Sequence, residues 1–257
     1  MVNHSPFSVQ KHIFCYNLSM FEQGRKNTQY IRKQMSRVIK DYSMINEGDR
    51  ILIAVSGGKD SLCLLEMLRA RQSFSPVKYE ISPVHFNEET INAHILEKYL
   101  KSNNYSYRIV GQIEKPRKKP RKSPCFNCSW ERRKRLFQIA EELKCNKIAL
   151  AHHMDDIIQT TLLNLFFMGE ISTMRPYQEL FGGKCHIIRP LAYVPEKALA
   201  AYSKARKFPK MKVQCPHGKD SARKFISDEI KRIEKRSPEV RKNVFRSLKR
   251  IRSDYLL

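Results

Sequence analysis

Short runs of apolar residues alternate along most of the chain with longer segments in which apolar residues recur every three or four positions. The short runs, which predict buried strands, cover residues 51–55, 81–86, 106–110, 148–151 and 186–189. The longer segments, which predict helices, cover residues 28–42, a stretch from about residue 60, a stretch around 91–96, and residues 130–143, 155–167 and 195–207. Strands that alternate with helices predict an α/β fold, in which right-handed crossovers join parallel strands.

Both ends of the chain differ from this middle part. Residues 1–27 show little periodicity and are interpreted as an N-terminal extension, whereas residues 28–215 form the main α/β domain. Residues 216–257 are a basic C-terminal extension, in which apolar residues such as Ile226 and Ile230 mark the buried side of a helix. Residues 111–124 interrupt the pattern, because the prolines and like charges of KPRKKPRK prevent a stable helix or strand. We interpret this stretch as a basic loop that contacts phosphates.

The first predicted strand leads directly into a glycine-containing string that precedes a helix. The string is Ser56-Gly57-Gly58-Lys59-Asp60-Ser61. Its glycines allow backbone N–H groups to close around an anion, and the helix N-terminus adds partial positive charge at the same place. The lysine contributes a full charge, and the two serine hydroxyls contribute donors. An ordinary strand-to-helix turn is the simpler interpretation. The whole string after a buried strand favours a nucleotide phosphate site, and its spacing differs from the Walker A pattern.

A second group of polar residues follows the fourth predicted strand. His152 and His153 stand at the end of this strand, and Asp155 and Asp156 open the next predicted helix. Ligands of parallel sheets bind beyond the carboxyl ends of the strands, so we expect this segment and the phosphate loop to form one site. The two aspartates are also typical helix caps. Asp60 can be a cap as well, or it can orient a Mg²⁺-bound water, because magnesium needs only one or two carboxylates besides phosphate oxygens.

The charge of the chain is strongly positive. Lys and Arg outnumber Asp and Glu by 49 to 25, which gives a formal net charge of +24. Such an excess predicts a polyanionic partner, most often nucleic acid, with a membrane surface as the alternative. No apolar run reaches the roughly eighteen residues that a transmembrane helix needs, and the first 27 residues lack the apolar segment of a signal peptide. We therefore expect a cytoplasmic protein that does not bind membranes.

The seven cysteines are an odd number, and without a secretory signal they do not predict a disulfide framework. Cys125 and Cys128 form a C-x-x-C motif, which we expect in a loop just before a helix. This spacing fits a redox pair, a zinc site completed by Cys215 and His217, or an iron–sulfur cluster with one distant cysteine. The cysteines that we expect to be buried and structural are Cys63, Cys145 and Cys185. Two other candidates are Trp130, which can stack on a base or shield a metal site, and Arg189, which can contact phosphate or form a salt bridge.

The glycine string resembles the PP-loop of the ATP pyrophosphatases, which cleave ATP between the α and β phosphates and adenylate a substrate oxygen. Further stretches, taken together, resemble the tRNA 2-thiocytidine synthetases, which thiolate the cytidine at position 32 of tRNA. These stretches are PCFNC ending at Cys128, Arg132-Arg133, IALAHHMDD ending at Asp156, Gln159-Thr160, Phe167-Met168-Gly169, IIRPLAYVPEKAL ending at Leu199, Phe208-Pro209 and Cys215-Pro216. The resemblance covers residues 28–248 and rests on the order and spacing of the motifs.

This resemblance implies a parallel-sheet PP-loop fold, similar to the adenine nucleotide alpha hydrolases, with helical N- and C-terminal additions. It implies that residues 56–61 bind ATP together with Mg²⁺. The residues to which it assigns catalytic roles are Lys59, Asp60, Asp155 and Asp156. ATP would adenylate the C2 carbonyl oxygen of a cytosine, and sulfide would then displace AMP.

The same resemblance implies a sulfur site. Cys125, Cys128 and Cys215 would hold a 4Fe–4S cluster whose fourth iron is free to take sulfide. The substrate would be tRNA, the sulfur would come from a cysteine desulfurase, and a homodimer is compatible with these roles. The loop before the C-x-x-C is more basic than the family pattern, and His85-Phe86-Asn87 is not its commonest form; both departures concern the target nucleotide.

Two other functions remain open at this point. One is a lysidine-synthetase-like tRNA ligase, which would need no metal cluster. The other is a zinc-containing nucleic-acid-binding protein that has lost ATP chemistry. The related two-thiouridine synthetases carry additional C-x-x-C or C-x-x-H pairs near both ends, and this chain has none there.

Overall fold

The computed structural model describes residues 6–86, 93–111, 124–211 and 222–255, with side chains described from residue 24, from residue 94 and from residue 130 in the first three stretches. Its strands are β1 (Asp49–Ala54), β2 (Tyr79–Phe86), β3 (Arg108–Val110), β4 (Lys147–Ala149), β5 (Tyr177–Leu180) and β6 (Cys185–Ile188). They form one six-stranded sheet in the order β3-β2-β1-β4-β6-β5. All neighbouring pairs are parallel except β5 and β6, so the expected parallel α/β fold is confirmed with one antiparallel strand added at the edge.

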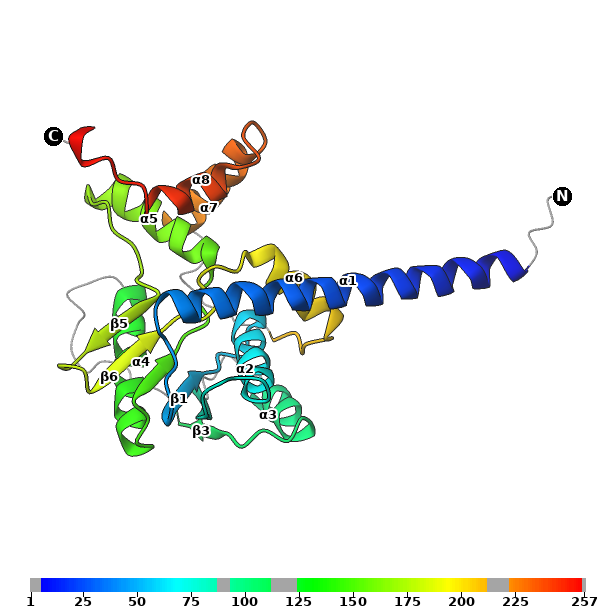
Figure 1. The fold of residues 1–257 in the computed structure, drawn as a ribbon, viewed down its shortest axis with the longest axis horizontal. Helices are drawn as coiled ribbons and strands as arrows, with labels where there is room; N and C mark the ends of the chain where they lie inside the picture. The colour runs from blue at the N-terminus through cyan, green and yellow to red at the C-terminus, as the bar shows by residue number, and fades with distance from the viewer. Residues whose placement is uncertain (1–5, 87–92, 112–123, 212–221, 256–257) are drawn as a thin grey trace.

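The helices lie on both faces of this sheet (Figure 1). They are α1 (Pro6–Asp41), α2 (Lys59–Gln72), α3 (Ala93–Ser102), α4 (Pro124–Glu142), α5 (Met154–Met168), α6 (Glu196–Ala205), α7 (Ala222–Glu234) and α8 (Val240–Ser247), followed by a 3-10 turn at Ser253–Tyr255. Alternate residues of a strand face opposite sides. Ile51 and Ile53 accordingly join the larger core cluster with α1, α2, α3 and α6, whereas Leu52 joins a second cluster under α4.

The first helix is much longer than its periodicity predicts. The pattern indicates a helix from residue 28, but α1 begins at Pro6, where a proline without an N–H is well tolerated in the first turn. An apolar period is required only where a helix buries one face. This happens at Ile31, Met35 and Val38, which pack against the body. Figure 1 shows the N-terminal half of α1 extending away from the sheet.

Two further boundaries differ from expectation. The α4 helix begins at Pro124, so the backbone of Cys125 and Cys128 lies in its first two turns and not in a loop before it. Proline at the first helical position explains this early start, because its missing N–H would have no intrahelical partner there. The sequence analysis also missed β5, whose half-buried residues show no apolar run. The basic KPRKKPRK tract lies outside the described residues.

The basic C-terminal stretch folds into α7 and α8, which pack on α5. Ile226 and Ile230 of α7 are buried against Ile158 of α5 in a small third cluster. The N-terminus of α5 lies at the carboxyl edge of the sheet, so this packing brings basic residues of the C-terminal helices close to that edge. No helix of the described residues is long and apolar enough to cross a membrane.

Candidate functional site

The expected phosphate loop connects β1 to α2. Gly57 has a φ of +83°, a conformation that an L-residue with a side chain rarely adopts. Gly58 is extended and precedes the first residue of α2. The Ser56 hydroxyl accepts a hydrogen bond from the N–H of Gly58 at 3.3 Å and donates to the Ser61 hydroxyl at 3.2 Å. Ser61 in turn donates to the carbonyl of Gly58 at 2.9 Å. The loop is therefore held in shape by its own serines.

A methionine from a distant segment covers this loop. Met211, which follows α6, packs against Gly57 so closely that a Cβ at residue 57 would lie 1.5 Å from the Met211 methyl carbon. A glycine is favoured here by the backbone conformation, and a side chain would in addition displace the flexible end of Met211. No local pattern predicts the position of Met211, because its contact with the loop depends on how the chain returns after α6.

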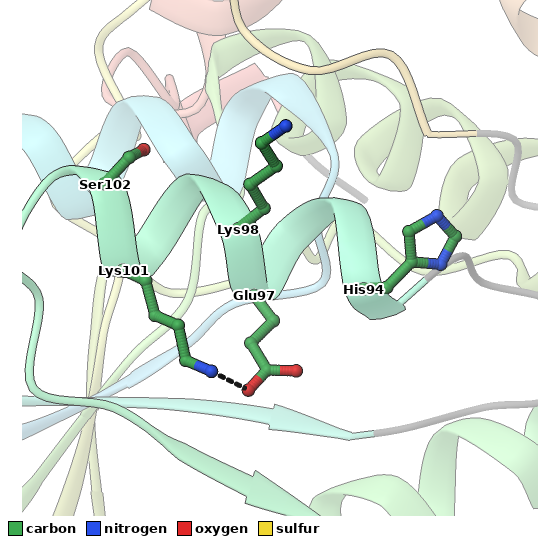
Figure 2. Close-up of a pocket in the computed structure, with 5 residues that line it drawn as sticks. All are labelled: His94, Glu97, Lys98, Lys101 and Ser102. Atoms are coloured by element: carbon green, nitrogen blue, oxygen red, sulfur yellow. Dashed lines mark ion pairs between the residues drawn. The ribbon is translucent and has the colours of Figure 1, made fainter.

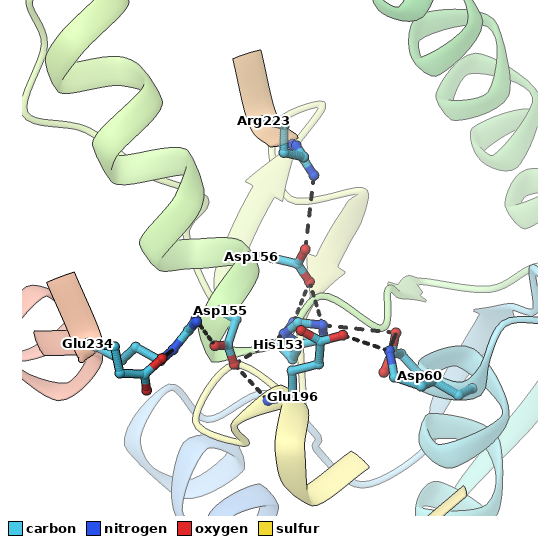
Figure 3. A network of polar contacts seen from close by, with 9 residues as sticks. Asp60, His153, Asp155, Asp156, Glu196, Arg223 and Glu234 are labelled. Atoms are coloured by element: carbon cyan, nitrogen blue, oxygen red, sulfur yellow. Dashed lines mark hydrogen bonds and ion pairs between the residues drawn. The ribbon is translucent and has the colours of Figure 1, made fainter. Parts of the chain in front are cut away.

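The lysine of the loop is paired with two carboxylates. Its Nζ lies 3.2 Å from Asp60 Oδ2 and 3.0 Å from Glu196 Oε1, at the start of α6 (Figure 3). The pKa of Lys59 is raised; burial acts against this, but the charge of Asp60 and the hydrogen bond to Glu196 outweigh it. Lys59 is therefore a fixed positive charge beside the loop. Glu196 was not among the predicted site residues, although it stands within a motif that the resemblance included.

Asp60 has one oxygen in use and one available. Its Oδ2 faces Lys59, whereas Oδ1 is buried and has no hydrogen-bond partner among the described residues. Burial raises the pKa of this carboxyl, and the charges of Lys59 and His153 oppose the shift. An orphaned carboxylate oxygen inside a protein is costly unless a cation or donor occupies it. Asp60 Oδ1 therefore fits a ligand of a cation such as Mg²⁺.

His153 lies among the acidic residues that follow β1 and β4. Its Nε2 lies 3.4 Å from Asp156 Oδ2 and 3.9 Å from Asp60 Oδ2, and its Nδ1 lies 3.8 Å from Asp155 Oδ2. The backbone N–H of His153 also donates to Asp156 Oδ2 at 3.0 Å, which caps the N-terminus of α5. The expectation that the phosphate loop and the segment after β4 meet is thus confirmed by these distances, as Figure 3 shows.

The two aspartates of α5 have different surroundings. Asp155 is buried, and both of its oxygens are taken: Oδ1 by Arg241 at 2.6 Å and Oδ2 by the N–H of Glu196 at 2.6 Å. It joins α5 to α6 and α8. Asp156 is more accessible, and its Oδ1 lies 4.0 Å from Arg223 of α7. Asp156 is therefore better placed than Asp155 to meet a ligand.

The predicted cysteine ligands cannot be placed in the same way. Cys215 lies outside the described residues, and only the backbone of Cys125 and Cys128 is described. The cysteines that were expected to be structural, Cys63, Cys145 and Cys185, are buried and unpaired with another cysteine. Within the described side chains there is no group of three or more His, Cys, Asp or Glu residues that could hold a metal ion. Trp130, after the C-x-x-C, is exposed.

Two cavities lie away from the phosphate loop. One, of about 380 Å³, follows the outer side of α3 and contains an ordinary ion pair between Glu97 and Lys101 (Figure 2). The other, of about 340 Å³, lies between the end of α1, α5, β5 and α8, and its lining includes Tyr42, Tyr177 and Phe245. Neither is lined by a residue of the loop, so the reactive groups lie elsewhere.

Comparison with known proteins adds to this geometry. Residues 27–232 match the PP-loop domain family. The chain is 37% identical over 235 residues to the tRNA-cytidine(32) 2-sulfurtransferase of Geotalea uraniireducens, covering 88% of this chain and 93% of that protein. It is 37% identical over 249 residues to the enzyme of the same name from Nitrosospira multiformis, covering 93% and 84%. A similar fold occurs in the U34-tRNA thiolase NcsA from Methanococcus maripaludis, solved with its [4Fe-4S] cluster, with a TM-score of 0.69, 22% identity and coverage of 86% and 78%.

Proposed function

This chain belongs to the PP-loop domain family and, within it, to the tRNA-cytidine(32) 2-sulfurtransferases, and we propose that it uses ATP to convert a tRNA cytidine to 2-thiocytidine. It is a tRNA sulfurtransferase. The observation that supports the chemistry most directly is the loop itself. A fixed cation, Lys59, lies beside a carboxylate oxygen, Asp60 Oδ1, that has no partner among the described residues, at the point where a strand passes into a helix.

The proposed reaction has two steps. The C2 carbonyl oxygen of the cytosine attacks the α-phosphorus of ATP, a new P–O bond forms, and the bond to pyrophosphate breaks. A sulfide nucleophile then attacks C2, and AMP leaves with the original oxygen. The products are 2-thiocytidine, AMP and pyrophosphate, and with sulfide as the nucleophile these two steps need no oxidant or reductant. The two electrons that convert the persulfide sulfur of a desulfurase to sulfide would come from a thiol reductant, which would be oxidised to a disulfide.

The phosphate loop would serve the first step. The positive end of α2 and the Lys59 ammonium favour the charge of the departing pyrophosphate. Glu196 and Asp60 hold that ammonium in place, which removes the cost of ordering it when ATP binds. We propose catalytic roles for Lys59 and Asp60, and also for the accessible Asp156.

The site fits Mg²⁺ through few protein ligands. Magnesium usually takes one or two carboxylates and fills its other positions with phosphate oxygens and water. Asp60 Oδ1 would be one ligand. Asp156 would contribute to the same site, because its carboxylate and that of Asp60 both lie within 4 Å of Nε2 of His153. Mg²⁺ would neutralise charge on the phosphates. Asp155 is a positioning residue in this proposal, because its contacts with Arg241 and the N–H of Glu196 fix the start of α5 and α6.

The sulfur chemistry is assigned to three cysteines. Cys125, Cys128 and Cys215 would hold a 4Fe–4S cluster, and this group, when bound, would supply an iron with a free position for sulfide. The first two lie in the first two turns of α4, which covers the face of the sheet opposite α2. We propose a cysteine desulfurase as the sulfur source, tRNA as the partner that the net charge of +24 favours, and the cytoplasm as the location. Assembly as a homodimer is part of the same proposal.

Iron, sulfide and nucleoside analyses of one set of variants test the proposal. The protein is isolated without oxygen, its iron and sulfide are measured, and tRNA nucleosides from a deletion strain complemented with each variant are analysed by mass spectrometry. The variants expected to lose both iron and 2-thiocytidine are Cys125→Ser, Cys128→Ser and Cys215→Ser. The matched controls, expected to keep both, are Cys63→Ser, Cys145→Ser and Cys185→Ser.

Other outcomes point to other functions. A colourless wild type without iron that still forms AMP with tRNA would favour a lysidine-synthetase-like ligase. One zinc per chain and no release of pyrophosphate would favour a nucleic-acid-binding module. Iron loss in Cys185→Ser with retention in Cys215→Ser would contradict the third ligand.

A further inference from the structure

A buried arginine at the end of β6 lacks an acidic partner. Arg189 is 3% exposed, yet no carboxylate forms an ion pair with it among the described residues. Its Nε donates to Nδ1 of His152 at 3.2 Å, and its Nη1 donates to the backbone carbonyl of Arg175. Within the described part of the chain, Nη2 has no hydrogen-bond partner. The guanidinium is thus held by neutral acceptors, with one donor group left over.

Strand alternation places this pair on the α4 side of the sheet. Ile148 and Leu150 belong to the cluster under α4, so His152 continues on that face, whereas His153 faces the phosphate loop. Arg189 follows Ile188, which belongs to the opposite cluster, and therefore also lies on the α4 side. The pair consequently lies on the side of the sheet whose covering helix carries the C-x-x-C motif in its first two turns (Figure 1).

The hydrogen bond determines the state of the imidazole. A guanidinium only donates, so Nδ1 of His152 must be an acceptor and the ring proton must be on Nε2. Burial and the charge of Arg189 lower the pKa of His152 to about 4, so the ring is neutral near pH 7. The pKa of Arg189 is lowered by burial and by Arg133 to about 10, which leaves it charged. Beyond their mutual contact, the two side chains therefore offer only donors.

A buried charge without a counter-charge is unfavourable, and a group that supplies only acceptor oxygens and negative charge removes that cost. We propose that Arg189 and His152 bind a phosphate group of a substrate on the α4 side of the sheet, through Nη2 of the arginine and Nε2–H of the histidine. This inference rests on the proposed function, which supplies two sources of such a group. One is the α-phosphate of ATP, and the other is a backbone phosphate of tRNA beside the target nucleotide.

Binding measurements with two probes distinguish these sources. The probes are an ATP analogue with a methylene group between its α and β phosphates, and unmodified tRNA at several salt concentrations. Arg189→Gln should weaken one of them about tenfold to hundredfold, as expected for the loss of a charge-assisted hydrogen bond. If tRNA is the source, the slope of the logarithm of its binding constant against the logarithm of the salt concentration should also become shallower by about one. Arg50→Gln is the control. This substitution removes the same charge, but Arg50 is exposed and lies at the start of β1, at the edge of the sheet opposite the phosphate loop.

A second variant covers the case in which Arg189→Gln does not fold. His152→Asn keeps an acceptor near the position of Nδ1 but lacks the donor at Nε2, so it should weaken the same probe by a smaller factor. Loss of affinity for the analogue alone assigns the site to the α-phosphate, and loss for tRNA alone assigns it to the backbone. Unchanged binding of both probes by the folded variants overturns the proposal. An effect of Arg189→Gln with none of His152→Asn removes the histidine from the site.

The wild-type protein separates this inference from the proposed function. If it forms no 2-thiocytidine, the proposed function fails, and the binding comparison still reports on the phosphate site. If it thiolates tRNA while the folded variants bind and react as it does, only the phosphate site is refuted.

Discussion

Replacing Gly57 by alanine should damage the phosphate loop for two separable reasons. The backbone there has a φ of +83°, and an alanine in the left-handed region costs about 1–2 kcal/mol. In addition, the new Cβ would lie 1.5 Å from the methyl carbon of Met211, where contacts of 3.4–4 Å are ordinary. Met211 must therefore leave its present position or push the loop away. Because the clash falls on the end of a flexible, partly buried side chain, moving Met211 to another rotamer should cost only about 0.5–1.5 kcal/mol.

Gly48 provides a matched control for the first effect. Its φ of +78° is similar, but nothing lies within 4 Å of a Cβ built there. Gly48→Ala should therefore lose about 1–2 kcal/mol from strain alone, whereas Gly57→Ala should lose about 1.5–3.5 kcal/mol in total. In a Met211→Ala background the clash is absent, so the further cost of Gly57→Ala should fall to the Gly48→Ala value.

Urea unfolding followed by circular dichroism measures these differences, since a shift of the midpoint at constant slope reports a change in stability. AMP formation with tRNA is measured on the same samples. Gly57→Ala should lose most of this activity, and Gly48→Ala should keep it. Equal destabilisation by Gly57→Ala and Gly48→Ala, in both backgrounds, would refute the contact between Met211 and the loop.

Three further predictions concern single side chains. Asp60→Asn should reduce AMP formation by at least about tenfold without lowering the thermal midpoint, because it removes a charge that faces a ligand; full activity would exclude Asp60 from catalysis. The pKa of His152 in the folded protein is about 4, which is below its value in the unfolded chain. Folding stability should therefore fall by up to about 3 kcal/mol as the pH is lowered from 6.5 to 4, because only the unfolded chain takes up the proton in this range. A profile that is as flat as that of His152→Asn would contradict this. The Lys147 ammonium lies 2.6 Å from the buried Asp49 carboxylate, so Asp49→Asn should cost about 3–5 kcal/mol, because it leaves the buried ammonium without its counter-charge. Asp49→Asn combined with Lys147→Met should cost less than the sum of the two single changes, which double-mutant unfolding would check.

Local patterns in the sequence were sufficient for most of the architecture. A continuous apolar run predicts a buried strand, and glycines between a strand and a helix predict a phosphate loop. The positions of β1 and of the loop after it were therefore predicted close to where they are observed. Patterns failed where burial is partial. The edge strand β5 has no apolar run, and α1 shows a period only where it packs on the body, so its start at Pro6 was missed.

The candidate site was predicted in its residue types but not in its pairing. Lys59, Asp60 and Asp156 were predicted from the sequence, because they are polar residues that follow the carboxyl ends of predicted strands, where ligands bind. The packing of α6 and α8 decided the pairing. It places Glu196 against Lys59, 137 residues away in the sequence, and it lets Arg241 and a backbone N–H bind the two oxygens of Asp155. Likewise, a salt bridge was one possibility for Arg189, and in the described part of the fold its partners are His152 and a backbone carbonyl instead. Periodicity and turn chemistry act between neighbours in the chain, whereas the partner of a charge is fixed by which helices meet in space.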